Sequence, residues 1–192
     1  EGSQGNPFLQ ERVPLTLPKE LLSGLEVKEG LVSSATPQEA RTQILQLVRD
    51  FVRRDVAPVA AMLDREDIVP LDLIDQMKGL GLFGITVPEE YGGLALDYTT
   101  FAMIFEELSK GFMSLSGAIG THHILTYVLT HSGTEEQRQR FLPDLAAGRK
   151  RGGLALTEPG GGSDVANLEL TAWRDGEEYV LNGTKTFITN GR

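Results

Sequence analysis

The chain has 192 residues, of which 40% are hydrophobic and 23% are charged, a composition typical of an ordinary globular protein. Its formal net charge of −9 argues against a nucleic-acid partner held by phosphate neutralisation. The absence of cysteine excludes disulfides, thiolate metal ligands and a cysteine nucleophile, and no run approaches the roughly 18 apolar residues of a membrane span.

The first residues, EGSQGNPFLQERVPLTLPKE, lack the basic end and apolar block of a secretion signal. We therefore expect a protein of the cytoplasm or the mitochondrial matrix that is not secreted. Residues 1–35 contain three prolines, which interrupt any long helix. They predict an extended arm with one short helix near Lys19 to Leu25.

The first strong helix signal begins at residue 36. Thr36 can cap a helix, Pro37 suits the first helical position, and Glu39 completes a capping box. Pro58 is expected to kink or interrupt this helix. Apolar residues recur at helical spacing between these points: Ile44, Leu47, Val48, Phe51 and Val52.

Further helices follow in chain order. The pattern predicts one helix from Leu71 to Leu80, ended by glycines, and another that Asp97 caps. A helix is also predicted from Ser114 to His131. The helix capped by Asp97 carries a core stripe of Phe101, Ile104, Phe105 and Leu108.

A last helix is predicted to open with a capping box formed by Thr134 and Gln137, and to end near Gly148. Beyond it, short apolar or alternating segments replace the helical pattern and are expected to form strands, among them LALTE at 154–158 and, after a hairpin signal at Asn182-Gly183, KTFITN at 185–190. Two or three strands cannot close a core of their own. We therefore expect an extension over residues 1–35, a helical domain over 36–149 and the truncated start of a β domain over 150–192.

The stretch TEPGGGSD, residues 157–164, is a candidate ligand-binding loop. Glycine amides without a Cβ can approach a flat or anionic ligand closely, and the threonine and serine add hydroxyl donors. No lysine follows as in a phosphate-gripping loop, and no helix pattern follows as in a dinucleotide fingerprint. Taken alone, such a loop is more often an ordinary surface turn than a binding site.

Four segments together carry more weight than this loop alone. VPEEYGG at 87–93, GTEEQRQRFLPDLAAG at 133–148, TEPGGGSD at 157–164 and YVLNGTKTFITNG at 179–191 resemble segments of the acyl-CoA dehydrogenases, in that family's order. The resemblance covers residues from about 36 to 192. It does not cover residues 1–35.

The resemblance implies an α+β chain, with an all-α N-terminal helical domain followed by the first strands of a β-barrel-like middle domain. The family's C-terminal four-helix domain would be absent from this chain. The implied enzyme is an FAD-dependent flavoprotein oxidoreductase of fatty acid metabolism that converts an acyl-CoA to the trans-2-enoyl-CoA. Its implied partners are the acyl-CoA substrate, an electron-transferring flavoprotein and other copies of itself in a homotetramer.

The resemblance also assigns site residues. Ser163 matches a contact to the CoA moiety as well as to the flavin pyrophosphate, and many relatives have Trp at the position of Phe187. The base, a glutamate in the family, is expected beyond Arg192, so the chain would be inactive alone. Glu158 is interpreted instead as a carboxylate that orders the turn or accepts N–H groups. The implied cofactor-binding residues are Leu154, Leu156, Thr157, Gly162, Ser163, Phe187, Ile188 and Thr189.

The sequence is also compatible with other functions. An acyl-CoA oxidase or a flavin monooxygenase would use the same scaffold, and a non-catalytic helical binding module would have lost the flavin.

His122 and His123 are adjacent on a helix and therefore point about 100° apart, so we expect no metal site there but buried residues or pocket walls. Tyr91 is interpreted as a loop anchor in preference to a substrate contact.

Overall fold

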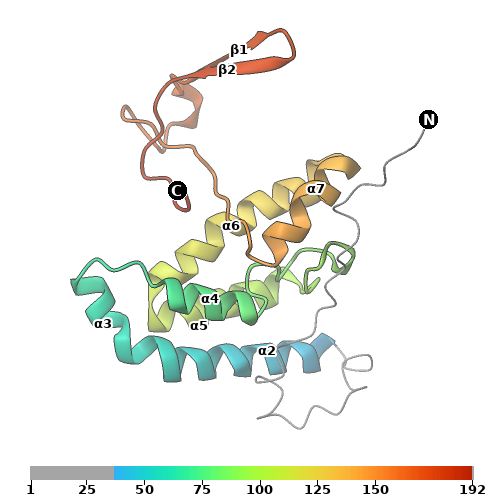
Figure 1. Ribbon diagram of the computed structural model, residues 1–192. Coiled ribbons are helices and arrows are strands. Elements are labelled where there is room, and N and C mark those ends of the chain that lie inside the picture. Colours follow the sequence, from blue (N-terminus) through green and yellow to red (C-terminus); the bar gives the residue numbers. More distant parts are fainter. Residues whose placement is uncertain (1–36, 192) are drawn as a thin grey trace.

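The computed structural model describes residues 37–191 (Figure 1). The expected arm with its short helix at Lys19 to Leu25, and the capping threonine Thr36, lie outside these described residues. No helix in the described part of the chain has both the length and the apolar character needed to cross a membrane.

Helices dominate the first part of the described chain. A short 3-10 turn, η3, spans Glu89–Tyr91, and a π-helical turn, η2, spans Val52–Val56. The α-helices are α2 (Pro37–Phe51), α3 (Ala57–Arg65), α4 (Leu71–Gly79), α5 (Tyr98–Gly111), α6 (Met113–Ser132) and α7 (Glu135–Ala146). The helices predicted from spacing and caps are therefore confirmed within a few residues of their expected ends.

Pro58 does interrupt the first long helix, as predicted. It has no N–H to donate, and its ring would clash with the carbonyl one turn earlier. The chain widens into η2 just before it, where the Ala57 N–H bonds to the carbonyl of Val52. Gly111 permits this turn to pack closely, because a Cβ at Gly111 would lie 2.6 Å from Val52 Cγ1. Figure 1 shows α3 turning away from α2 at this point.

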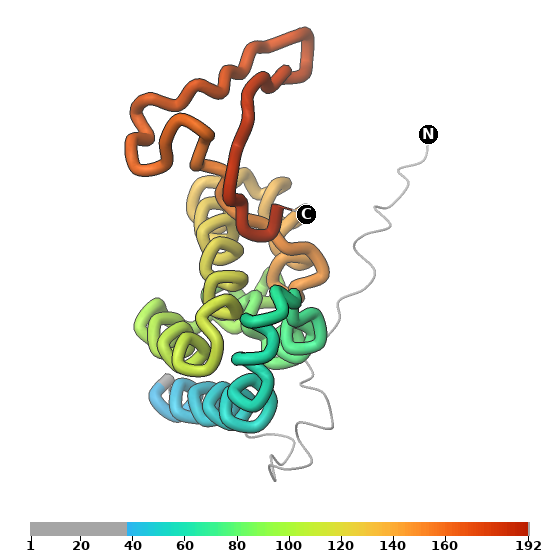
Figure 2. Tube along the Cα trace, turned by 90° about the vertical axis from the view of Figure 1, so that its left-hand side faces the viewer, coloured from blue at the N-terminus to red at the C-terminus, as the bar shows by residue number. Residues whose placement is uncertain are grey.

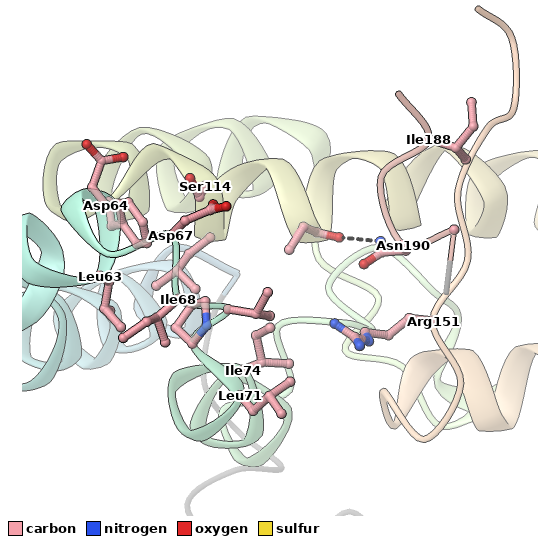
Figure 3. A pocket seen from close by; sticks show the side chains of 16 residues that line it. Leu63, Asp64, Asp67, Ile68, Leu71, Ile74, Ser114, Arg151, Ile188 and Asn190 are labelled. Atoms are coloured by element: carbon pink, nitrogen blue, oxygen red, sulfur yellow. Dashed lines mark hydrogen bonds between the residues drawn. The ribbon is translucent and has the colours of Figure 1, made fainter. Parts of the chain in front are cut away.

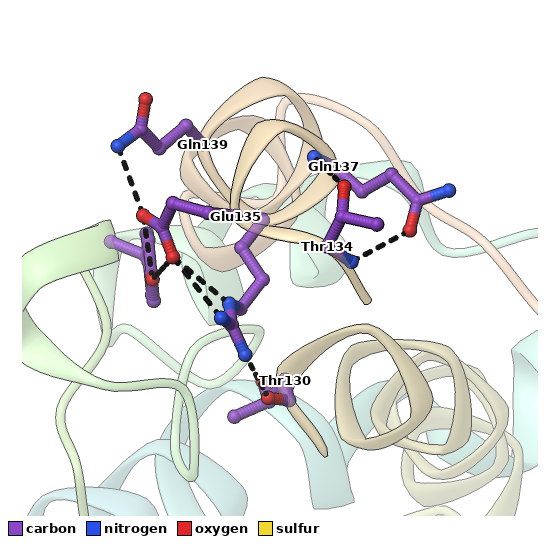
Figure 4. Close-up of polar contacts among 7 residues, drawn as sticks. Thr130, Thr134, Glu135, Gln137 and Gln139 are labelled. Carbon is purple, nitrogen blue, oxygen red and sulfur yellow. Dashed lines mark hydrogen bonds and ion pairs between the residues drawn. The ribbon is translucent and has the colours of Figure 1, made fainter. Parts of the chain in front are cut away.

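Local caps fix the ends of two helices. Asp97 Oδ1 accepts a hydrogen bond from the Thr100 backbone N–H at 2.7 Å, at the start of α5. Thr134 and Gln137 form the reciprocal capping box at the start of α7 (Figure 4). The neighbouring Glu135 accepts the hydroxyl of Tyr91 at 3.1 Å. Since Tyr91 is also buried, its interpretation as a loop anchor is confirmed.

The core forms where α2, α4, α5 and α6 meet. Ile104 and Leu108 of the predicted stripe are fully buried, while Phe101 and Phe105 pack against the core from its edge. The other fully buried hydrophobic residues of this cluster are Val48, Val56, Met77, Leu82, Phe83, Ile85, Leu115 and Ile119. The segments that follow residue 149 are attached to this helical body.

One antiparallel hairpin follows, with β1 (Thr171–Asp175) paired to β2 (Glu178–Asn182). It turns at Gly176, whose φ is +61°, and projects away from the helices with its side chains largely exposed (Figures 1 and 2). The expected architecture, helices followed by a short antiparallel sheet, is confirmed.

Two details of that sheet were predicted wrongly. Asn182 and Gly183 do not turn a hairpin, because β2 ends there and the following residues do not form a strand. Phe187 and Asn190 both have positive φ, which an extended strand does not permit. The segment LALTE at 154–158 likewise belongs to no strand, apart from a single bridge at Glu158.

Candidate functional site

The two segments singled out in the sequence lie side by side. The Thr186 backbone N–H donates to the carbonyl of Thr157 at 2.9 Å. At Gly153 the backbones approach so closely that a Cβ would lie 2.5 Å from the Thr189 carbonyl oxygen. We call residues 153–158 the first segment and residues 185–190 the second segment. Because glycine has no Cβ, Gly153 allows the backbones of the two segments to lie in contact.

A buried carboxylate at the end of the first segment joins it to the second segment. Glu158 is 6% exposed and accepts hydrogen bonds from the backbone N–H groups of Glu169 and Leu170, at 2.6 and 3.0 Å. It also forms an ion pair with Lys185 at 2.8 Å. Hydrogen bonds from Lys185, Glu169 and Leu170, in that order, lower the pKa of Glu158 to about 2. Its interpretation as an N–H-accepting carboxylate is confirmed.

The glycine loop closes on itself directly after Glu158. Glu158 and Gly161 exchange two backbone hydrogen bonds, of 2.9 and 3.1 Å, which make a tight turn. A Cβ at Gly161 would meet nothing, whereas a Cβ at Gly162 would lie 3.1 Å from Thr157 Cγ2. The backbone at Gly162 is therefore bare and close to the Thr157 side chain, and Ser163 follows on the exposed side of the turn.

The second segment presents an aromatic ring on a strained backbone. Phe187 has φ of +56°, rare for a bulky residue, and the residue is 94% exposed. The adjacent Thr186 hydroxyl is buried and has no hydrogen-bond partner. An exposed ring, an unpartnered hydroxyl and the side-chain-free backbone of the glycine turn together fit a flat, polar-edged ligand such as the flavin that the resemblance implies.

Asn190 attaches the second segment to the helical body. Its Nδ2 donates to the carbonyl of Ala118 in α6 at 2.9 Å and to the carbonyl of Gly152 at 3.1 Å. It also approaches Thr121 Oγ1 at 3.4 Å. Figure 3 shows Asn190 reaching from its loop toward α6. Asparagine tolerates the positive φ of +62° found here better than most residues do.

His122 fixes the start of the first segment. Its Nε2 donates to the carbonyl of Leu145 at 3.1 Å, so its Nδ1 accepts from the Gly152 N–H at 3.3 Å. Burial, reinforced by His123, lowers the pKa of His122 to about 4 and keeps the ring neutral. His122 and His123 are both buried, as expected. Within residues 37–191 no three potential ligand side chains converge as a metal site.

One hollow borders the second segment, and another lies along the neighbouring helices. One cavity of about 490 Å³ lies between the α3–α4 connection, the start of α6 and the loop at 188–191, and Arg151 and Asn190 face it (Figure 3). The second, of about 500 Å³, is an apolar groove along α5 and α6 that we call the α5–α6 groove. It is lined by Phe101, Ala102, Phe105, Gly117, Gly120, Thr121 and Ile124.

The sequence-predicted site residues therefore fall into one region but differ in exposure. Phe187, Ser163 and Thr189 are exposed, and Leu154 is about half exposed. Leu156, Thr157, Gly162 and Ile188 are half-buried. The structure brings the two segments together and adds three residues that the sequence did not single out as site residues: Lys185, Asn190 and His122. Lys185 and Asn190 lie within the segment YVLNGTKTFITNG at 179–191, but their partners are far away along the chain.

Comparison with known proteins agrees with this geometry. The family model described as acyl-CoA dehydrogenase, N-terminal domain, matches residues 38–149, and the model of the acyl-CoA dehydrogenase middle domain matches residues 153–192. An acyl-CoA dehydrogenase of Bacillus subtilis (strain 168) is 38% identical over 159 residues, which cover 80% of this chain and 41% of that protein. The chain thus spans about two fifths of the length of that relative.

Solved structures give the same result. One described as an electron transferring flavoprotein of Acidaminococcus fermentans has a TM-score of 0.76 at 37% identity, covering 80% of this chain and 41% of its own. An acyl-CoA dehydrogenase complexed with FAD from Bacillus anthracis has a TM-score of 0.69 at 34% identity, and the match covers 81% of this chain and 27% of that chain. With its N-terminal domain model matched over residues 38–149, this chain belongs to the acyl-CoA dehydrogenase family.

Proposed function

We propose that the protein containing this chain catalyses the FAD-dependent α,β-dehydrogenation of an acyl-CoA thioester to the trans-2-enoyl-CoA. One observation carries the proposal. The first and second segments are hydrogen-bonded side by side through Thr157 and Thr186, and Asn190 joins them to the helix that forms one wall of an apolar groove. A cofactor site and a site for an acyl chain would therefore be neighbours.

The residues present fit a flavin. The proposed contacts to its ring are Leu154, Leu156 and Thr157 from the first segment, and Phe187, Ile188 and Thr189 from the second. Gly162 and Ser163 would meet its pyrophosphate, where a bare backbone and a hydroxyl suit an anion. A bound flavin supplies the two-electron acceptor that this chemistry needs. The exposed Phe187 ring would provide a stacking face, although it lacks the N–H of a tryptophan.

The α5–α6 groove suits an acyl chain. Its volume of about 500 Å³ and its lining of phenylalanine rings, glycines and Ile124 offer apolar surface with few polar groups. Thr121 contributes to its wall and also approaches the Asn190 side chain. A chain bound in this groove would therefore extend toward the second segment. Ser163, on the exposed side of the glycine turn, is the proposed contact to the CoA moiety.

We place the general base outside the described residues. Glu158 is the one carboxylate of the two segments, and its oxygens already accept bonds from Lys185, Glu169 and Leu170. A carboxylate held as the anion in this way is a weak proton acceptor. Its role in this proposal is to order the turn. We further propose a domain division after residue 149, an electron-transferring flavoprotein as the electron acceptor, and a homotetramer.

The test uses the purified protein at its full natural length. We expect it to retain FAD, to show flavin absorbance, and to lose that absorbance anaerobically when a saturated acyl-CoA is added. Free CoA, which lacks the acyl chain, is the matched control and should leave the absorbance unchanged. A protein that does not retain FAD in the presence of excess cofactor would refute the proposal.

The electron acceptor separates this function from an oxidase on the same scaffold. Substrate-reduced protein should be reoxidised by an electron-transferring flavoprotein much faster than by air. Rapid turnover with oxygen alone would instead identify an acyl-CoA oxidase or a flavin monooxygenase.

A further inference from the structure

The ion pair between Lys185 and Glu158 is the most buried one that joins described residues. The two side chains are 16% and 6% exposed, whereas the other ion pairs between described residues have at least one side chain exposed by a quarter or more. The Lys185 Nζ donates to Glu158 Oε1 at 2.8 Å and to the carbonyl of Leu156 at 2.9 Å. It therefore bonds to the first segment at two points.

Three stretches of chain meet at this pair. Glu158 accepts the backbone N–H groups of Glu169 and Leu170 at the entry to β1, in addition to Lys185. The glycine turn, which lies between Glu158 and Glu169, is thus held at both of its ends. Directly after Lys185, the Thr186 N–H bonds to the carbonyl of Thr157. The register between the first and second segments depends on this set of contacts.

We infer that Lys185 and Glu158 are positioning residues for the flavin: their ion pair holds Thr157 and the glycine turn opposite Phe187 to Thr189 at the spacing the cofactor requires. The inference rests on the proposed function, because it presupposes that these segments bind FAD. Neither side chain is assigned a contact to the cofactor or to the reacting atoms. They act through the backbone that they hold.

Removing only one of the two charges leaves the other buried without a counter-ion. If Lys185 is removed, Glu158 is left as a buried carboxylate with two backbone donors and no counter-ion. If Glu158 loses its charge, Lys185 is left as a poorly solvated cation beside the carbonyl of Leu156. Either change favours movement of the segments toward water, which would separate Thr157 from Thr186.

The test compares variants of the full-length protein loaded with FAD. Lys185→Met and Glu158→Gln should each weaken FAD affinity at least about tenfold and shift the visible absorption band of the flavin that remains bound. Lys185→Arg keeps the cation and its donors, so it should recover most of the affinity and the wild-type band. Lys150→Met is the matched control, since Lys150 forms an exposed ion pair with Asp144 at 3.0 Å, outside both segments. It should bind FAD as the wild type does.

Hydrogen exchange of the protein without FAD provides a second measurement. The amides of Glu169, Leu170 and Thr186 should exchange slowly in the wild type and faster in Lys185→Met, while the amides of α5 stay protected in both. This comparison also shows whether the variant has kept its helical fold. If the helices of Lys185→Met unfold, the inference is tested by comparing the FAD affinity of Glu158→Gln with that of the wild type.

The outcomes separate the two proposals. Wild-type protein that binds FAD, with Lys185→Met and Glu158→Gln binding it equally well and with the same spectrum, would overturn this inference alone. Wild-type protein that retains no FAD would overturn the proposed function and this inference with it. Loss of affinity in both variants, recovered by Lys185→Arg, would support the positioning role.

Discussion

Gly120 of α6 lies against the ring of Phe105 of α5, so closely that a Cβ at this position would stand 2.9 Å from the ring's Cε2 atom. Both residues line the α5–α6 groove. The missing side chain therefore determines how near the two helices pack and how wide the groove is beside the ring. Because glycine costs helix stability, its presence in the middle of α6 is best explained by this close approach.

Substitution of this glycine should narrow the groove. In Gly120→Ala the Phe105 ring must move, and we expect the protein to bind a long acyl-CoA such as octanoyl-CoA about tenfold more weakly. Binding of butyryl-CoA should change little, because a short chain need not pass the ring. The measurement is the ratio of the dissociation constants for the two ligands. Gly79→Ala in α4, where a Cβ would meet nothing within 4 Å, is the control. An equal change for both ligands would contradict the prediction.

Asn190→Asp tests the attachment of the second segment to α6. The substitution keeps the shape and the tolerance of positive φ, but it replaces two N–H donors with a carboxylate oxygen that faces the carbonyls of Ala118 and Gly152. The free energy of unfolding should fall by about 1–3 kcal/mol, since both carbonyls lose their donor. Urea unfolding measures this fall.

The control for this change is Asn190→Gly, which also accepts the backbone conformation but leaves the carbonyls without an opposing charge. It should cost less than Asn190→Asp. If both variants are as stable as the wild type, the amide contacts do not hold the loop.

The fold was predictable where its signals are local. The caps at Asp97 and Thr134 and the effect of Pro58 depend on residues within one or two turns, and the structure confirms each of them. The hairpin was misplaced because Asn182-Gly183 is a signal for a local turn only, and the described residues after Gly183 form no strand that could pair with β2. The actual turn has its own signal, Gly176 between two alternating stretches, in a position that suits a two-residue hairpin loop.

The site could be predicted only in part, and the reason is the distance along the chain. The glycine turn and Phe187 stand out by composition and by resemblance. Lys185 bonds to an acceptor 29 residues away and Asn190 to one 72 residues away, and no periodicity connects such partners. The strained backbone of Phe187 is likewise invisible in the sequence, because phenylalanine ordinarily favours extended chain.

Phe187→Gly should separate stability from cofactor binding. Glycine adopts the φ of +56° without strain, and the exposed ring contributes little packing that could be lost. The free energy of unfolding should stay the same or rise by about 1 kcal/mol. Affinity for FAD should fall, because the proposed stacking face is gone. Thermal unfolding and flavin titration measure the two effects on the same sample.

Phe187→Trp is the matched variant for this experiment. It restores an aromatic face and should bind FAD at least as well as the wild type. A marked loss of stability in Phe187→Gly, or unchanged FAD affinity, would count against a role for the ring in binding the cofactor.

The buried His122 predicts a fall in stability under mildly acidic conditions. Burial lowers its pKa in the folded state from 6.5 to about 4, so between these values the unfolded chain binds a proton that the folded chain does not. Above pH 6.5 both states are neutral, and His122 contributes no pH dependence. As the pH falls from 6.5 to 4, its contribution lowers the free energy of unfolding by up to about 1.4 kcal/mol per pH unit. Burial also lowers the pKa of His123, which adds to the slope with the same sign.

His122→Gln isolates this contribution. Glutamine cannot titrate, yet its amide can donate to the carbonyl of Leu145 and accept from the Gly152 N–H as the imidazole does. Urea unfolding at several pH values between 7 and 4 should therefore show a shallower slope in this variant. His131→Gln, a change of the exposed histidine on the same helix, should keep the wild-type slope. If His122→Gln and the wild type lose stability in parallel on acidification, proton uptake by other groups dominates and His122 is not the acid-sensitive contact between α6 and the first segment.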